Sequence, residues 1–210
     1  LVEKNARAGR LSFTTDLPAA VAGADAVFIA VGTPSRRGDG HADLSYVYAA
    51  AAEVAAALDP DDYTVIVTKS TVPVGTGREV ARIIRKTRPE ADFDVASNPE
   101  FLREGCAVAD FRNSDRIVIG AADAASADVL GRVYQDFTCP KLVTTPRNAE
   151  MIKYASNALL ATLISFSNEI AGLCEAVPGL DEAVVMEGLH LDRRLSPIHA
   201  GERVRPDMLS

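Results

Sequence analysis

Two glutamates and a lysine–asparagine pair are the side chains of this sequence best suited to acid–base chemistry. The segment SNPEFLREG places Glu100 and Glu104 four residues apart behind an Asn-Pro turn. In EMIKYASN, Lys153 and Asn157 are also four apart, so they would share one face of a helix. A carboxylate near a lysine can move a proton, and an ammonium can stabilise an oxygen that gains negative charge. These four residues are therefore candidate catalytic groups.

Each pair also fits a plain structural role, because carboxylates, lysines and asparagines are most often solvated at protein surfaces. The surroundings of Lys153 and Asn157 argue for partners, since most of their neighbours along the helix are apolar. These neighbours are Met151, Ile152, Tyr154, Ala155, Ala158 and Leu159. Glu100 and Glu104 could be the partners, and the sequence leaves that contact open.

The composition limits the classes of function. The chain has 210 residues, 48% of them apolar and 24% charged, which is typical of a soluble globular protein. A formal net charge of −7 predicts no nucleic-acid partner. No apolar run approaches the roughly 20 residues of a membrane helix, and no signal peptide is recognisable. Cys106, Cys139 and Cys174 lack metal-ligand spacing, so we expect a reducing cytoplasm and no metal site.

The first half of the chain alternates between strand-like and helix-like segments, which would carry the candidate residues. Apolar runs predict buried strands, and this alternation predicts βαβ units on a parallel sheet. Asp43 is a plausible N-cap for the first helix. The expected strands lie within 24–34, 64–75, 93–100, 116–120 and 141–145, and the expected helices at 43–58, 77–88 and about 123–136.

After Pro146 the pattern becomes helical. Residues 148–177 contain one glycine and no proline, which predicts a long helix, and residues 181–189 predict a shorter one. The expected fold class is α/β, a partial Rossmann-type parallel sheet with flanking helices, followed by a long helix and a small helical unit. The expected domain boundaries are 1–145 for the sheet, 146–189 for the helices and 190–210 for an irregular tail.

Three expected strands end in unusual turns: VGTPS at 31–35, KSTVPVG at 69–75 and SNPEFLREG at 97–105. Each mixes glycine or proline with small polar residues, which lets backbone N–H groups approach a ligand. Ligands of open parallel sheets bind at the carboxyl ends of the strands. The three turns together therefore predict a nucleotide or phosphate site.

Several segments together resemble the UDP-glucose/GDP-mannose dehydrogenase family. They are AVGTPSRRGDGHADLSYV, TKSTVPVGTG, SNPEFLREG, DRIVIG and EMIKYASNALLAT, in the family's order and spacing from about Thr14 to Asp192. The resemblance implies NAD-dependent oxidation of the C6 hydroxyl of a nucleotide sugar to a carboxylate, with two NAD per turnover. A cysteine of the family captures the aldehyde as a thiohemiacetal, which becomes a thioester that water hydrolyses.

The loop SRRGDGHADLSYV looks more like the UDP-glucose branch, which implies oxidation of UDP-glucose to UDP-glucuronate for polysaccharide synthesis. GDP-mannose and UDP-N-acetyl-hexosamine are the alternative substrates within the family. A non-catalytic, degenerate homologue that retains nucleotide binding or self-association is the alternative outside catalysis. Family members dimerise through the long helix, so the resemblance also implies a homodimer.

The resemblance assigns roles to the candidate residues. Glu100 would be the general base for thioester hydrolysis, and Lys153 would stabilise negative charge on the C6 oxygen. Asn157 would hold water or a hydroxyl, and Thr71 would add a hydrogen-bonding hydroxyl beside them. Glu100 and Glu104 would face a water-poor pocket.

Further contacts follow from the same resemblance, and one arginine would reach the substrate of the partner subunit. The expected NAD contacts are Val31, Gly32, Thr33, Pro34, Ser35, Ser70, Thr71, Val72 and Glu104. The expected substrate contacts are Glu100, Phe101, Leu102, Arg103, Glu104, Lys153, Asn157 and, for the partner's substrate, Arg194.

These 210 residues depart from the family's pattern in three places. No Gly-x-Gly-x-x-Gly fingerprint occurs, although the family uses one for the NAD pyrophosphate. After HAG at 199–201 the chain reads ERVRPDMLS in place of a GGSCFPKD-like motif with the nucleophilic cysteine, and the LSPIHAG stretch before it looks shortened. We therefore expect an internal fragment that cannot complete catalysis alone. Cys106 is the nearest candidate for a substitute nucleophile, although nothing around it matches the cysteine motif.

Overall fold

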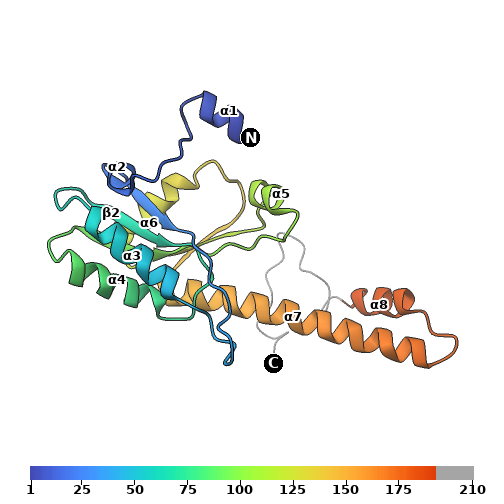
Figure 1. Cartoon of the computed structure of the whole chain (residues 1–210). Helices are drawn as coiled ribbons and strands as arrows, with labels where there is room; N and C mark the ends of the chain where they lie inside the picture. Colours follow the sequence, from blue (N-terminus) through green and yellow to red (C-terminus); the bar gives the residue numbers. More distant parts are fainter. Residues whose placement is uncertain (193–210) are drawn as a thin grey trace. The chain divides into compact units, whose positions relative to one another are not determined.

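Within residues 1–192, five strands form one sheet in the order β1-β2-β3-β4-β5. Figure 1 shows this sheet with its flanking helices. The computed structural model describes residues 1–192, and the chain divides into two units, Leu1–Ala155 and the residues from Ser156 onward. The predicted domain boundaries stay a prediction. The strands are β1 Ala26–Ile29, β2 Thr64–Thr68, β3 Phe93–Ser97, β4 Ile117–Gly120 and β5 Lys141–Thr144.

The strand directions agree with the predicted parallel sheet except at one place. β1 pairs parallel with β2, β2 with β3, and β4 with β5. β3 and β4 are antiparallel and pair only at Ser97 and Gly120. A parallel return needs a crossover element packed on the sheet, but the connection carries only α5, Ala107–Arg112, which has no buried residue. The fold class is confirmed, with a mixed sheet in place of a wholly parallel one.

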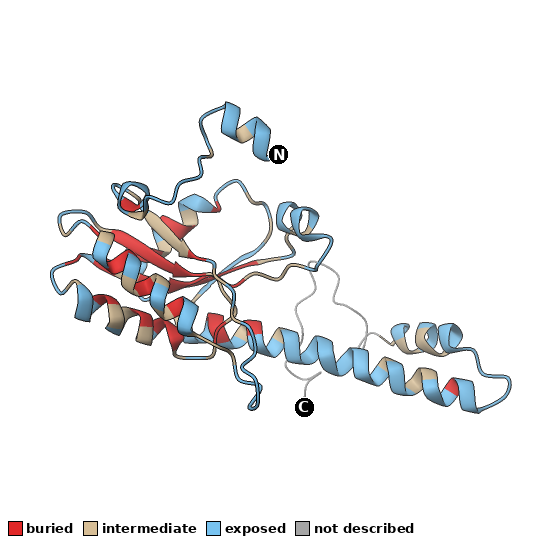
Figure 2. Ribbon diagram, in the orientation of Figure 1, coloured by how far each residue is buried: buried red, intermediate tan, exposed pale blue. Residues whose placement is uncertain are grey.

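Helices cover both faces of the sheet, as the buried residues in Figure 2 show. On one face, Ile66 packs with residues of α3, Ser45–Ala57, and α4, Thr76–Thr87. On the other face, Val65 and Val67 pack with residues of α6, Ala124–Val133. Neighbouring residues of a strand point to opposite faces. This explains why all of β2 is buried and reads as a continuous apolar run in the sequence.

Two short helices precede the first strand, α1 at Val2–Arg7 and α2 at Leu17–Val21. The expectation that Asp43 caps α3 is wrong in detail, because the helix begins one residue later with Leu44 at the N-cap position. Asp43 Oδ1 instead accepts a hydrogen bond from the Ser45 N–H at 3.0 Å. Asp43 therefore forms the turn that leads into the helix.

The predicted long helix is α7, Pro146–Ala176, and the shorter one is α8, Glu182–His190. Asp181 caps α8 by accepting from the N–H groups of Ala183 and Val184. The most apolar stretch of α7 is long and apolar enough to cross a bilayer and is not buried. One such helix is weak evidence for a membrane, since a helix covered by a partner chain has the same composition.

Candidate active site

The loops after β1 and β2 are joined by hydrogen bonds at the carboxyl ends of these strands. Ser70 Oγ donates to the carbonyl oxygen of Val31 at 2.6 Å, and Thr33 Oγ1 donates to the carbonyl oxygen of Thr71 at 3.0 Å. These bonds hold two of the predicted ligand-binding turns side by side. The hydroxyls of Ser70 and Thr33 are engaged in shaping the loops.

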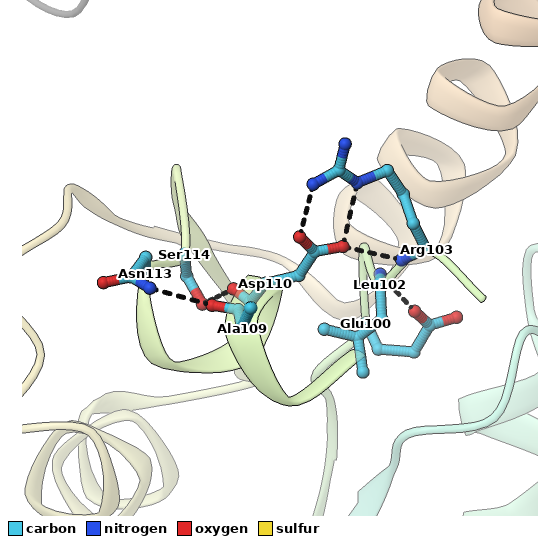
Figure 3. Close-up of polar contacts among 7 residues, drawn as sticks. All are labelled: Glu100, Leu102, Arg103, Ala109, Asp110, Asn113 and Ser114. Atoms are coloured by element: carbon cyan, nitrogen blue, oxygen red, sulfur yellow. Dashed lines mark hydrogen bonds and ion pairs between the residues drawn. The ribbon is translucent and has the colours of Figure 1, made fainter. Parts of the chain in front are cut away.

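The third turn brings Glu100 to Lys153 of α7. The Lys153 ammonium donates to Glu100 Oε1 at 2.9 Å, and the Leu102 N–H donates to Glu100 Oε2 at 2.6 Å (Figure 3 draws the Leu102 bond). The Lys153 side chain is 7% exposed and that of Glu100 is 30% exposed. The pair is thus closed on the lysine side and open on the glutamate side.

Opposing effects set the pKa of Glu100. Burial raises the pKa, but the hydrogen bonds from the Leu102 N–H and the Lys153 ammonium, with the charges of Lys153 and Lys69, lower it below its ordinary value. Glu100 is therefore an anion at neutral pH. The ionised carboxylate can accept a proton, and this is the protonation state that a general base needs.

Two cations lie close to the ring of Phe101. The Arg116 guanidinium is 4.0 Å from the ring centroid of Phe101, and the Lys153 ammonium is 5.4 Å from it. Both cations interact favourably with the negative face of an aromatic ring. Phe101 thus helps to fix the direction in which Lys153 extends from α7.

Lys69 is a site residue that the sequence analysis missed. Its ammonium donates to the backbone carbonyl of Asn98 at 3.3 Å and to Asn98 Oδ1 at 3.2 Å. Burial lowers the pKa of Lys69, while the charge of Glu100 raises it. Asn98 is itself buried and donates to the carbonyl oxygen of Val118 at 2.8 Å. The only signal in the sequence is the place of Lys69 at the end of a buried strand.

Arg103 is held by α5. Its guanidinium donates to Asp110 Oδ1 at 2.7 Å and to Oδ2 at 3.1 Å, and its backbone N–H donates to Oδ2 at 2.9 Å (Figure 3). Hydrogen bonds from the side chain and backbone of Arg103 lower the pKa of Asp110 to about 2. This bidentate pair fixes the loop that carries Glu100. The predicted role of Arg103 in substrate binding stays a prediction.

Glu104 does not share the environment of Glu100. The expectation that both glutamates face a water-poor pocket is wrong for Glu104, which is exposed. Gly105 follows it with a φ of 79°, a backbone conformation that favours glycine, and α5 begins two residues later. The two carboxylates therefore lie in different surroundings, although they are four residues apart.

The remaining predicted residues are those of the cofactor loops, Asn157 and Arg194. Gly32, Pro34 and Ser35 are exposed, Val31, Thr33, Ser70 and Thr71 are half-buried, and Val72 is buried. Asn157 belongs to the second unit. Arg194 lies outside the described residues.

The cysteines make no disulfide within residues 1–192: Cys106 is exposed, Cys139 partly buried and Cys174 buried. Over the same residues, no group of three or more histidine, cysteine or acidic side chains could hold a metal ion. The geometry brings Lys153 and Glu100 together beside the joined loops after β1 and β2, and these residues form the candidate site.

Comparison with known proteins identifies both parts of the chain. Residues 1–138 match the NAD binding domain of the UDP-glucose/GDP-mannose dehydrogenase family, and residues 147–205 match its central domain. UDP-glucose 6-dehydrogenase of Rhizobium meliloti (strain 1021) is 58% identical over 208 residues, which cover 96% of this chain and 47% of that protein. UDP-glucose 6-dehydrogenase TuaD of Bacillus subtilis (strain 168) is 50% identical, over 93% of this chain and 42% of that protein. The chain spans about half the length of the curated relatives it matches.

Solved structures agree with these matches. A UDP-glucose dehydrogenase from Pyrobaculum islandicum has a TM-score of 0.87 and 48% identity, covering 92% of this chain and 45% of that one. A ternary complex of GDP-mannose dehydrogenase from Pseudomonas aeruginosa has a TM-score of 0.88 and 35% identity, covering 96% of this chain and 47% of that one.

Proposed function

Because this chain belongs to the UDP-glucose/GDP-mannose dehydrogenase family, we propose that it supplies part of an NAD-dependent enzyme that oxidises UDP-glucose to UDP-glucuronate. Relatives named UDP-glucose 6-dehydrogenase support this choice of sugar. The observation that carries the proposal is the Lys153–Glu100 pair, 2.9 Å apart and open on the Glu100 side. The pair shares its sheet edge with the loops expected to hold the cofactor.

The loops after β1 and β2 fit a dinucleotide. The backbone around Gly32 is open, since a Cβ placed there would meet no atom within 4 Å. The hydroxyl of Thr71 donates to no group in residues 1–192, so it is available to a ligand. When bound, NAD accepts the hydride from C6. Val31 to Ser35 and Ser70 to Val72 would hold it at the sheet edge.

Lys153 would stabilise the oxygen at C6. Its ammonium has three N–H donors, and the Glu100 bond uses one of them. The others can reach an oxygen that gains negative charge as the hydride leaves. The low exposure of Lys153 strengthens this interaction because little water competes for the charge.

Glu100 would act on water. Its carboxylate is ionised at neutral pH because of Leu102 and Lys153, despite the opposing effect of burial. The exposed part of the carboxylate can accept a proton from a water molecule during release of the acid product. Asn157 would hold water or a sugar hydroxyl, and Arg194 would reach the substrate of a partner subunit.

The exposed apolar side of α7 supports a homodimer, and the unpaired cysteines of the described residues suit a reducing cytoplasm. Leu159, Leu160, Leu163 and Ile164 are each at least half exposed. An apolar surface of this kind is rarely left open to water, and a second copy of the same helix would cover it. The product would then feed polysaccharide synthesis.

The test uses the polypeptide expressed from the complete reading frame that contains these residues. Purified protein is incubated with NAD and one nucleotide sugar: UDP-glucose, GDP-mannose or UDP-N-acetylglucosamine. The amounts of NADH and of sugar acid formed are then measured. The proposal predicts two NADH for each UDP-glucuronate and much slower reaction of the other sugars. Faster oxidation of another sugar would show that the enzyme is a GDP-mannose or UDP-N-acetyl-hexosamine dehydrogenase of the same family. Binding of UDP-glucose without NADH formation would support the non-catalytic alternative.

A further inference from the structure

Glu150, near the start of α7, is a buried carboxylate that none of the proposed steps uses. It is 2% exposed. Its Oε2 accepts a hydrogen bond from the Gly75 N–H at 2.6 Å, and its Oε1 accepts one from the Gly77 N–H at 2.8 Å. Both N–H groups lie at the start of α4. The two oxygens of one side chain therefore fasten α7 to the first turn of another helix.

This contact replaces a local cap. Gly75 is the N-cap residue of α4, and no side-chain hydrogen bond comes from that position. The first N–H groups of a helix have no partner within the helix, and the helix dipole favours a negative charge beside them. Glu150 supplies both the acceptors and the charge.

The glycines make room for the carboxylate. Gly75 has a φ of 99°, a conformation that residues with a Cβ rarely adopt. A Cβ on Gly77 would lie 3.3 Å from Glu150 Oε1, which is tighter than an ordinary contact. The GTG sequence at 75–77 is thus matched in shape to this one side chain.

Glu150 also stands next to the candidate active site. Lys153 follows it by three residues on α7, so the two side chains leave neighbouring parts of the helix surface. On the other side, Gly75 ends the loop that carries Ser70, Thr71 and Val72. The two bonds of Glu150 therefore connect the expected cofactor loop to the helix that presents Lys153 to Glu100.

We propose that Glu150 is a positioning residue, which holds Lys153 against Glu100 by fixing α7 to the amide groups of Gly75 and Gly77. The importance of this position for catalysis rests on the function proposed for Lys153. The simpler alternative is a cap that stabilises the fold without affecting the Lys153–Glu100 pair.

The titration of Glu100 distinguishes these two roles. In the intact pair, the Leu102 N–H and Lys153 lower the pKa of Glu100 against the effect of burial, and the charge of Lys69, just after β2, also lowers it. If Lys153 moves away, the pKa of Glu100 must rise. A loss of fold stability alone leaves the pKa in the folded molecules unchanged.

The experiment is a carboxyl-carbon NMR titration of the 210-residue chain labelled at glutamate, with thermal unfolding recorded in parallel. The variants are Glu150→Gln, Glu150→Ala and Gly77→Ala. Lys153→Met gives the full effect of losing the ammonium. Glu79→Gln removes a partly exposed carboxylate of α4 that is paired with Arg82 of the same helix. Gly131→Ala adds a methyl group in α6 where no atom lies within 4 Å.

We expect the pKa of Glu100 to rise in both Glu150 variants, in the same direction as in Lys153→Met and by a large part of that shift. Gly77→Ala should give a smaller rise, and Glu79→Gln and Gly131→Ala none. If the Glu150 variants do not fold, the milder Gly77→Ala variant decides. A lower melting temperature with an unchanged pKa of Glu100 would overturn the proposal. The titration needs neither NAD nor turnover, so its outcome is independent of whether the enzyme oxidises UDP-glucose.

Discussion

The ammonium of Lys153 lies 2.9 Å from the carboxylate of Glu100, although the two residues are 53 positions apart in sequence. The lysine is almost enclosed and the glutamate is open along one edge. An ion pair with one accessible edge can meet a substrate oxygen or a water molecule without first exposing both charges.

The stability of the chain should depend on Glu100 above mildly acidic pH. The hydrogen bonds from Leu102 and Lys153 outweigh burial and lower the folded-state pKa of Glu100 below 4.5. The ionised carboxylate therefore contributes stability above its unfolded pKa, and this contribution is lost as the pH falls through the folded pKa. Urea unfolding at several pH values from neutral to about pH 3 measures this contribution. The difference in free energy of unfolding between the wild type and Glu100→Gln should become smaller as the pH falls. A difference independent of pH would contradict this.

Replacing Tyr134 by phenylalanine should destabilise the fold. The Tyr134 hydroxyl donates to Oδ1 of the buried Asn98, and burial raises the pKa of Tyr134 to about 12. Losing this bond should lower the free energy of unfolding by about 1 kcal/mol, the net value of a buried hydrogen bond. Urea denaturation measures the change. Tyr46→Phe is the control because Tyr46 is 57% exposed, and an equal loss there would refute the explanation.

Gly120→Ala should disturb the packing of the start of α7 against β4. A Cβ on Gly120 would lie 2.6 Å from the Cβ of Ala149 and 2.8 Å from the Cα of Pro146. Such overpacking should cost about 1–3 kcal/mol of unfolding free energy. Gly131→Ala, in open space, should cost nothing or stabilise slightly. Equal midpoints for the wild type and Gly120→Ala in urea would show that the helix can move aside freely.

A charge on the apolar side of α7 should prevent self-association. Leu163 and Ile164 are 52% and 62% exposed, and burying a lysine there in a dimer would leave its charge without a partner. Leu163→Lys should shift the mass seen by light scattering from dimer to monomer. Ser165→Lys adds the same charge on roughly the opposite side of the helix and should leave the dimer intact. A monomeric wild type would contradict the proposed interface.

The elements with one strong local signal could be predicted from the sequence. The buried β2 run, the long α7 and the helices that flank the sheet follow from hydrophobic periodicity and from the absence of proline and glycine breaks. The antiparallel β3–β4 pair could not be predicted this way. A parallel pair would need a crossover helix packed on the sheet, and α5, the helix between β3 and β4, has no buried residue. Whether a helix packs on the sheet is decided by tertiary structure and not by a local sequence signal.

The candidate site was predictable only in part for the same reason. Glu100 and Lys153 stand out because charged residues interrupt apolar segments. Lys69 and Glu150 carry no such signal, since their roles arise from backbone groups that are distant in sequence. An acidic residue near the start of a long helix is ordinary until the helix N-terminus opposite it is known.

A double-mutant cycle in the polypeptide from the complete reading frame tests whether Lys153 and Glu100 act together in the reaction. Rates of NADH formation are compared for the wild type, Lys153→Met, Glu100→Gln and the double variant, with Lys86→Met as an exposed control. If the two residues act as one unit, each single variant should lose about 100-fold or more. The double variant should then be little slower than the worse single variant. Losses that simply multiply would show that the two residues act independently, and single variants with wild-type rates would show that neither takes part in the reaction.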